Sequence, residues 1–83
     1  MTGVKTTDYY LDITTDVCPM TFVKTKLMVE RMSLGQTLEV RLNDGEPLEN
    51  LPRSLRELGH EILEIAPEDA DPSGRVHRLR MRK

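Results

Sequence analysis

Apolar and polar residues alternate along several short stretches of the chain, which is the pattern of β-strands with one buried face. In the first stretch, Tyr9, Leu11 and Ile13 would share one face, opposite Tyr10 and Asp12. The four predicted strands cover residues 8–13, 36–42, 61–66 and 75–82. Each strand is therefore expected to turn an apolar face toward a core and a polar face toward water.

A first helix is predicted from Pro19 to about Leu34, where apolar residues recur at helical spacing. The stripe that would face the core consists of Phe22, Thr25, Met28, Val29 and Met32. Pro19 suits the first helical position, because the N–H group that proline lacks would have no partner there. Gly35 is expected to end this helix.

A second helix is predicted because leucines recur three and four residues apart, at Leu48, Leu51, Leu55 and Leu58. Asn50 is a candidate for its N-terminal cap, which would place Pro52 near the first turn. Gly59 is expected to end the helix.

The order strand, helix, strand, helix, strand, strand predicts an α+β fold built as a two-layer βαβαββ sandwich. Both helices would cover one face of a four-stranded mixed sheet, with right-handed strand–helix–strand crossovers and an antiparallel closing pair. The chain is expected to form a single domain over residues 1–83, with its core at about 9–82. The other face of the sheet would be solvated and carry cross-strand ion pairs among Tyr10, Asp12, Glu39, Arg41, Glu64, Arg78, Arg80 and Arg82.

The charge of the chain limits the classes of function that can be expected. The 83 residues include twelve Lys/Arg and fourteen Asp/Glu, for a formal net charge of −2. Residues 36–72 carry ten acids against three arginines, whereas residues 73–83 carry five bases and no acid. A nucleic-acid-binding domain usually has a net positive charge, so direct nucleic-acid binding is not expected.

No apolar run approaches the roughly 18 residues of a membrane span, and the polar start lacks the apolar stretch of a secretory signal, so a cytoplasmic location is expected.

Cys18 is the single cysteine, and it directly precedes Pro19 at the predicted helix start. On this interpretation Cys18 caps the helix, where unsatisfied N–H groups and the helix dipole would favour its thiolate and lower its pKa. A small hydrophobe filling the strand-to-helix corner is an equally weighted alternative. One cysteine with His60 and His77 is too few for a closed structural zinc site, so no metal and no cofactor are expected.

Residues Asp12 to Pro19 opening a helix, followed by Gly35, Leu38, Val40, Asp44, Pro52 and the pair Gly59-His60, resemble the TusA/SirA family of small sulfur-carrier proteins. The resemblance covers about residues 9–82 and implies the same fold as the hydrophobic pattern. It also implies that Cys18 carries sulfur as a persulfide. The sulfur would come from a donor such as a cysteine desulfurase or a rhodanese and pass to an acceptor sulfur-relay protein.

The sequence departs from the family pattern at two positions. The family hallmark is Cys-Pro-x-Pro, and Thr21 replaces its second proline. Thr15 stands where a glycine usually precedes the cysteine by three residues. Thr21 is expected at the third helical position, where its hydroxyl could reach Cys18 or a backbone group. These departures predict a variant branch whose acceptor need not belong to the tRNA thiolation route.

Two other classes of function compete with a sulfur carrier. A small RNA- or protein-binding regulatory module would use Arg78, Arg80 and Arg82, with a structural cysteine, although an alternating row of this kind is more often a solvated strand face. A thiol redox module would need an intermolecular partner, because the chain has no resolving cysteine.

Several single residues carry weaker hypotheses. Val23 and Leu27 could form an apolar docking surface near the cysteine, although packing at the flank of the helix is the more ordinary role. His60 is expected to close the second helix, and His77 to be partly buried on the last strand. Asp16 would oppose thiolate formation at Cys18 if its carboxylate lay close to the thiol. Lys24, Lys26 and Arg31 could steer anionic partners, but they are more often simply solubilising.

Overall fold

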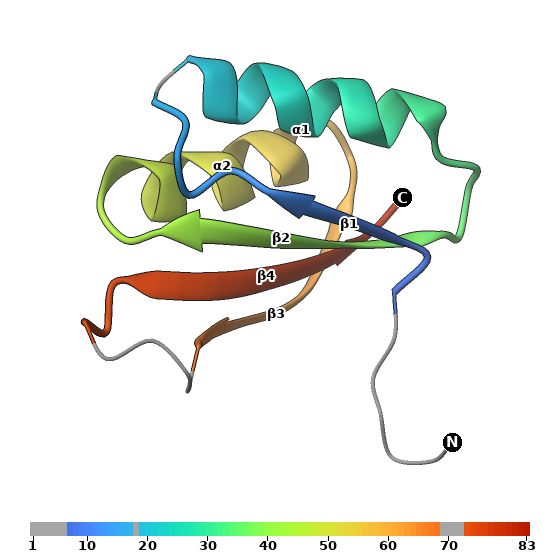
Figure 1. Ribbon diagram of the computed structural model, residues 1–83. Helices are drawn as coiled ribbons and strands as arrows, with labels where there is room; N and C mark the ends of the chain where they lie inside the picture. Colours follow the sequence, from blue (N-terminus) through green and yellow to red (C-terminus); the bar gives the residue numbers. More distant parts are fainter. Residues whose placement is uncertain (1–6, 18, 69–72) are drawn as a thin grey trace, which may run out of the picture.

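Four strands and two helices follow one another in the predicted order. In the computed structural model, which describes residues 7–17, 19–68 and 73–83, the elements are β1 (Tyr9–Asp12), α1 (Met20–Arg31), β2 (Thr37–Asn43), α2 (Glu46–Glu57), β3 (Glu61–Pro67) and β4 (Val76–Arg82). The predicted α+β class is confirmed (Figure 1). Within the described residues, no helix is long and apolar enough to cross a membrane.

The sheet is mixed, and its strand order is β1-β2-β4-β3. β1 and β2 are parallel, as expected for strands joined through a helix. β4 lies between β2 and β3 and is antiparallel to both, so the predicted antiparallel closing pair is confirmed. The connection from β2 through α2 to β3 therefore passes over the position of β4 in the sheet.

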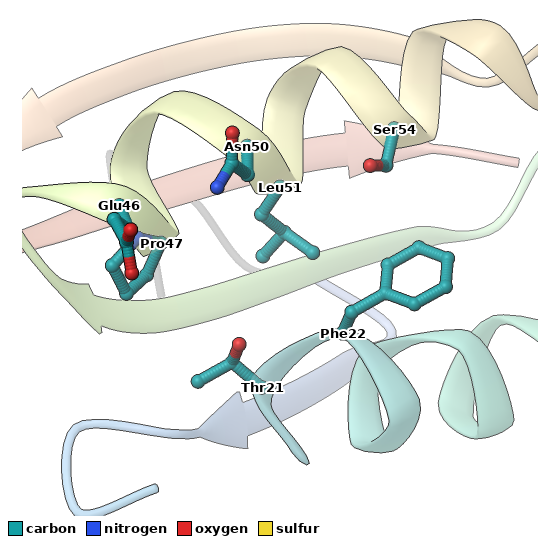
Figure 2. Close-up of a pocket in the computed structure, with 7 residues that line it drawn as sticks. All are labelled: Thr21, Phe22, Glu46, Pro47, Asn50, Leu51 and Ser54. Atoms are coloured by element: carbon teal, nitrogen blue, oxygen red, sulfur yellow. The ribbon is translucent and has the colours of Figure 1, made fainter. Parts of the chain in front are cut away.

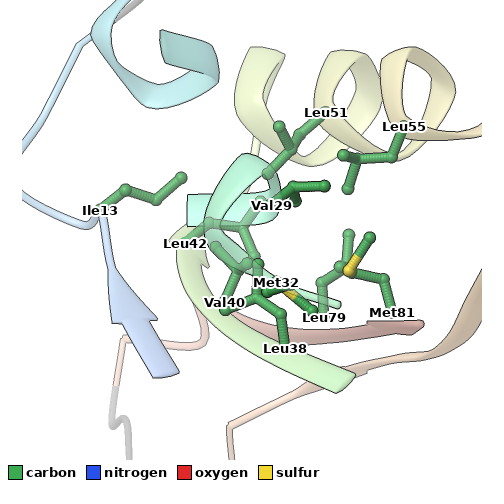
Figure 3. Close-up of a cluster of buried hydrophobic side chains, with 10 residues drawn as sticks. All are labelled: Ile13, Val29, Met32, Leu38, Val40, Leu42, Leu51, Leu55, Leu79 and Met81. Carbon is green, nitrogen blue, oxygen red and sulfur yellow. The ribbon is translucent and has the colours of Figure 1, made fainter. Parts of the chain in front are cut away.

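The core lies between both helices and one face of the sheet. Alternate residues of β2 are fully buried, as the hydrophobic pattern predicts. Figure 3 shows the side chains of α1 and α2 gathered over the inward residues of β2 and β4. The buried cluster consists of Ile13, Val29, Met32, Leu38, Val40, Leu42, Leu51, Leu55, Leu79 and Met81. Both helices therefore pack against the same face of the sheet.

Helix α1 is shorter than predicted at both ends. Pro19 is its N-cap and not its first helical residue, so the prediction that Cys18 caps the helix is wrong by one position. Thr21 is consequently the second helical residue and not the third. The helix ends at Arg31, and the N–H of Met32 donates to Val29 O at 3.0 Å. Gly35 lies beyond this end, so it does not terminate the helix as expected.

Helix α2 begins several residues earlier than predicted. Its N-cap is Gly45, whose φ of 88° lies in the left-handed region that favours glycine. Pro47 occupies the first turn, which is the place that the sequence analysis gave to Pro52. Pro52 lies inside the helix and is buried. Asn50 is not the cap, and its Oδ1 accepts a hydrogen bond from Arg53 Nη2 at 2.7 Å.

The end of α2 follows the prediction. Gly59 adopts a φ of 93°, and its N–H donates to Arg56 O at 3.0 Å. The N–H of His60 donates to Leu55 O at 3.0 Å. This pair of bonds is the Schellman arrangement, which satisfies two carbonyls of the last turn. His60 therefore closes the second helix, as expected.

The open face of the sheet carries a network of ion pairs, as predicted. Arg41 of β2 lies directly opposite Arg78 of β4, and the two like charges share Glu68 as a common partner. Glu68 accepts from Arg41 Nε at 2.8 Å and from Arg78 Nε at 2.9 Å. These two guanidinium groups lower the pKa of Glu68 to about 2. Arg41 also pairs with Asp12, whose pKa is lowered mainly by hydrogen bonds from Thr14.

A bulge in β3 brings two glutamates to the outward face of that strand. The pairing of β3 with β4 shifts register between Ile62 and Glu64. Glu61 and Glu64 are three residues apart, yet they pair with Arg82 and Arg80 on the same strand. An unbulged strand would place residues three apart on opposite faces, so the bulge allows both pairs to form.

Candidate functional site at the start of the first helix

The candidate site is the segment where the chain leaves β1 and begins α1. Cys18, the predicted persulfide residue, lies outside the described residues. The site is therefore described through the residues on either side of it in sequence. Val17 and Pro19 on either side are both exposed, and Val17 has 74% of its surface open to solvent. Met20 follows at the first helical position and is 43% exposed. The residues that flank Cys18 are therefore accessible to another molecule.

The first turn of α1 uses some of the N–H groups that were expected to be free. Val17 O accepts from the N–H of Met20 at 2.7 Å and from that of Thr21 at 3.3 Å. Pro19, the N-cap, has no N–H to offer. Fewer backbone donors therefore remain for a thiolate than the sequence suggests, although the helix dipole is unaffected.

The turn between β1 and α1 forms without a glycine. Asp12 Oδ1 accepts from the backbone N–H of Thr14 at 2.9 Å and from its hydroxyl at 2.7 Å. Thr14 O in turn accepts from Asn43 Nδ2 at 2.7 Å. Among the described residues only glycines have positive φ, so Thr15 occupies its position in an ordinary backbone conformation. The replacement of the family's glycine by Thr15 thus creates no strained backbone.

An ion pair connects this turn to the helix. Lys24 Nζ lies 2.9 Å from Asp16 Oδ1 and 3.0 Å from Asp16 Oδ2. The sequence suggested Asp16 as a charge near Cys18 and Lys24 as a solubilising or steering residue, but not that the two form a pair. Neither alternation nor helical spacing predicts a contact between residues eight apart across a turn.

Thr21 faces inward, toward a pocket between the two helices. Figure 2 shows its hydroxyl directed into the space below α2, which Leu51 and Phe22 border. The other residues that line this pocket also come from α2, namely Glu46, Pro47, Asn50 and Ser54. Thr21 O accepts the hydroxyl of Thr25 at 2.9 Å. The expected contact of the Thr21 hydroxyl with Cys18 lies outside the described residues and stays a prediction.

Four apolar residues form an exposed band that begins beside Cys18 and continues along α1. They are Val17, Met20, Val23 and Leu27, and the last two were singled out from the sequence as a possible docking pair. The three helical members recur at spacings of three and four, so they lie along one side of α1. The alternative of flank packing is not favoured, because Leu27 is 54% exposed. The helical spacing of Met20 ahead of Val23 could have revealed the longer band.

The other candidate residues lie apart from this segment. His60 closes α2 and is half-buried, and His77 is half-buried on β4, with Nδ1 3.2 Å from Arg75 O. Within the described ranges, no three His, Cys, Asp or Glu side chains are grouped so that they could hold a metal ion. Arg78, Arg80 and Arg82 all face carboxylates across the sheet. The interpretation of this row as a solvated strand face is therefore supported.

Comparison with known proteins identifies a family for this chain. The family model described as sulfurtransferase TusA matches residues 9–83. A relative in Archaeoglobus fulgidus is 42% identical over 55 residues, which cover 66% of this chain and 62% of the relative. A relative in Thermotoga maritima is 40% identical over 63 residues, covering 76% and 77%, and one in Methanocaldococcus jannaschii is 39% identical over 54 residues, covering 64% and 71%.

Each of these relatives bears the name "Putative sulfur carrier protein". The match spans a little over three fifths of the Archaeoglobus protein and about three quarters of the Thermotoga protein. The family model, in contrast, extends over nearly all of the present chain, from β1 to the residue after β4. The chain therefore belongs to the TusA sulfurtransferase family.

Proposed function

We propose that this chain is a sulfur carrier that holds sulfane sulfur as a persulfide on Cys18. The observation that carries the proposal is membership of the TusA family together with a single cysteine directly ahead of Pro19 and α1. The names of the relatives support the same role. A carrier needs only one accessible thiol, and the residues on both sides of Cys18 are exposed.

The proposed chemistry consists of two successive nucleophilic attacks, analogous to thiol–disulfide exchange. The Cys18 thiolate attacks the terminal sulfur of a donor persulfide, R–S–SH. The bond between the two donor sulfurs breaks, its electron pair leaves on the donor as R–S⁻, and Cys18 becomes Cys18–S–SH. An acceptor nucleophile then attacks the terminal sulfur and releases the Cys18 thiolate. Neither step needs an external oxidant or reductant.

The exposed apolar band is the surface that we assign to the partners. Val17 and Met20 lie immediately on either side of the Cys18-Pro19 pair, so a protein that reaches the thiol must cover them. Burying exposed apolar side chains of this size is favourable for association. The band continues for two further turns through Val23 and Leu27, which would extend the contact along α1.

The proposed partners are proteins that handle sulfane sulfur. The donor would be a cysteine desulfurase or a rhodanese, and the acceptor a sulfur-relay protein. Thr21 replaces a motif proline three residues after Cys18, so the acceptor need not be that of other family branches, because it would contact this position and the pocket that Thr21 lines. The cytoplasmic location expected from the sequence stays a prediction.

The competing RNA-binding function has less support. Each arginine of the β4 row is paired with a glutamate, and Arg78 has two such partners. Binding a phosphate backbone would require these pairs to break, which would offset the gain from counterion release. A function centred on Cys18 therefore remains the better proposal.

Mass spectrometry of the intact protein tests the proposal. The chain is incubated with a cysteine desulfurase and cysteine, and its mass is compared before and after treatment with a reductant. One added sulfur atom is expected on the wild type, removable by the reductant and absent from Cys18→Ser. The proposal is wrong if neither this donor nor other sulfane donors add sulfur to the folded wild-type chain.

A further inference from the structure

The ion pair between Asp16 and Lys24 has a geometry that distinguishes it from an ordinary surface contact. Lys24 Nζ is within 3.0 Å of both carboxylate oxygens of Asp16. The Asp16 side chain is only 17% exposed, whereas that of Lys24 is 44% exposed. Partial burial of the carboxylate reduces screening by water, so this pair is better defined than one between two fully exposed side chains.

The location of the pair relates it to the proposed sulfur site. Asp16 is two residues before Cys18, so their α-carbons can be no more than about 7 Å apart. Lys24 is in the second turn of the helix that follows Cys18. The pair therefore joins the segment before the cysteine to the helix after it, and it closes a loop of chain that contains residue 18.

The remaining contacts fix the same segment from its other side. The N–H of Asp16 donates to Ile13 O at 3.1 Å, and Ile13 is buried in the core. Val17 O accepts from the first two N–H groups of α1. Without Lys24, the backbone of Asp16 would still be held, but its carboxylate would have no cation to fix its direction.

We propose that Lys24 is a positioning residue for sulfur transfer, which acts through Asp16 to hold the segment before Cys18 and to compensate the negative charge of the Asp16 carboxylate. This inference rests on the proposed function, because it concerns the reactivity of Cys18. It assigns to Lys24 a role that steering or solubility would not require. It also explains how an acidic residue can be tolerated two positions before a thiolate.

Other charged groups near the first turn must be considered in any test. Glu46 faces this turn from the start of α2, because it lines the same pocket as Thr21. Asp12, at the end of β1, is paired with Arg41 on the open face of the sheet. Lys26 is exposed on the same helix, two residues beyond Lys24. Lys26 is thus a matched control, since its loss removes the same charge without releasing Asp16.

The test measures the pKa of Cys18 from the rate of alkylation as a function of pH. Lys24→Gln is expected to raise this pKa by about half a unit, because a freed carboxylate within several ångströms disfavours the thiolate. Lys26→Gln should produce a clearly smaller change, and Lys24→Arg should retain the wild-type value. In an Asp16→Asn background, Lys24→Gln should leave the pKa unchanged, because Lys24 would have nothing to act through.

Two results would overturn the inference. One is an equal rise of the pKa for Lys24→Gln and Lys26→Gln, which would mean that only net charge matters. The other is an equal effect of Lys24→Gln with and without Asp16, which would mean that Lys24 acts on the thiol directly. Circular dichroism confirms that each variant is folded. Sulfur loading of Lys24→Gln distinguishes this inference from the proposed carrier function. A variant that loads sulfur and has an unchanged Cys18 pKa refutes the inference but not the carrier function.

Discussion

Thr21 occupies the position of the second proline in the family motif, and the structure explains why either residue fits there. It is the second residue of α1, where a backbone N–H has no partner within the helix. Its N–H reaches Val17 O only at 3.3 Å, and the N–H of Met20 satisfies the same oxygen at 2.7 Å. Helix α2 of the same chain carries Pro47 at its own second position. The loss of the motif proline therefore leaves the start of the helix intact.

Restoring the motif with Thr21→Pro should change the free energy of unfolding by less than about 1 kcal/mol, because proline is tolerated in the first turn and stiffens the unfolded chain. Thr25→Pro is the matched control, one turn further along, where proline removes a helical hydrogen bond and should cost about 3 kcal/mol or more. Urea unfolding of both variants measures the difference. Equal destabilisation by the two prolines would contradict the assignment of Thr21 to the first turn of α1.

At the scale of single residues, the sequence indicated candidate residues but not what they contact. The proximity of Cys18 to a helix start was correct to within one position. The pairing of Asp16 with Lys24 was not foreseen, because it depends on how the turn folds back onto the helix. The same holds for Glu68, which lies outside the predicted strands and joins two arginines that are 27 and 10 residues away in sequence.

At the scale of elements, periodicity predicted the buried faces well. Inward residues of β1, β2 and β4 alternate as expected, and Leu51 and Leu55 face the core from α2. Helix ends were predicted less well, since a proline within a helical pattern usually marks its first turn. For Pro52 this inference was wrong, because α2 begins directly after Gly45 and Pro52 lies inside the helix. The bulge in β3 depends on how that strand pairs with β4, and it was not predicted from the sequence.

The inward face of α2 gives a prediction about stability. Leu55 is fully buried, so Leu55→Ala should lower the free energy of unfolding by about 2–5 kcal/mol through lost burial and the cavity that remains. Leu58, on the same helix-terminal turn, is 50% exposed, and Leu58→Ala should cost less than about 1 kcal/mol. Denaturant midpoints of the two variants provide the comparison. Similar midpoints would contradict the assigned orientation of α2.

At the scale of the whole molecule, the sheet brings the acidic and the basic parts of the sequence together in ion pairs. The acidic middle of the sequence supplies Glu39, Glu61, Glu64 and Glu68, and the basic last strand supplies Arg78, Arg80 and Arg82. Sequence counting revealed the imbalance, but only the strand order places the two groups face to face. The charges on the open face are therefore compensated within the sheet, and α1 begins at one end of the structure (Figure 1).

Glu68 should make the stability of the whole fold dependent on acid pH. Its pKa is about 2 in the folded protein, compared with an ordinary value of 4.5, because Arg41 and Arg78 stabilise its charged form. A lowered pKa contributes stability above the ordinary value, and this contribution is lost as the pH falls from about 4.5 toward 2. Glu68→Gln should therefore be less stable than wild type at neutral pH, with the difference shrinking through that window.

Thermal unfolding at a series of pH values measures this effect. Glu57→Gln, which changes an exposed residue at the end of α2, serves as the control and should follow the wild-type profile. A constant difference between Glu68→Gln and wild type from pH 7 to pH 2 would contradict the account of two opposed arginines that depend on one shared carboxylate.

The central claim is that Cys18 holds sulfur in a transferable form, and cyanolysis of the loaded chain tests it most directly. Cyanide attacks the terminal sulfur of a persulfide, leaves as thiocyanate and returns the cysteine thiolate. After loading and removal of the donor, we expect one thiocyanate per wild-type chain and none from Cys18→Ser. The account would be contradicted by a loaded wild-type chain that releases no thiocyanate, or by equal release from the two proteins.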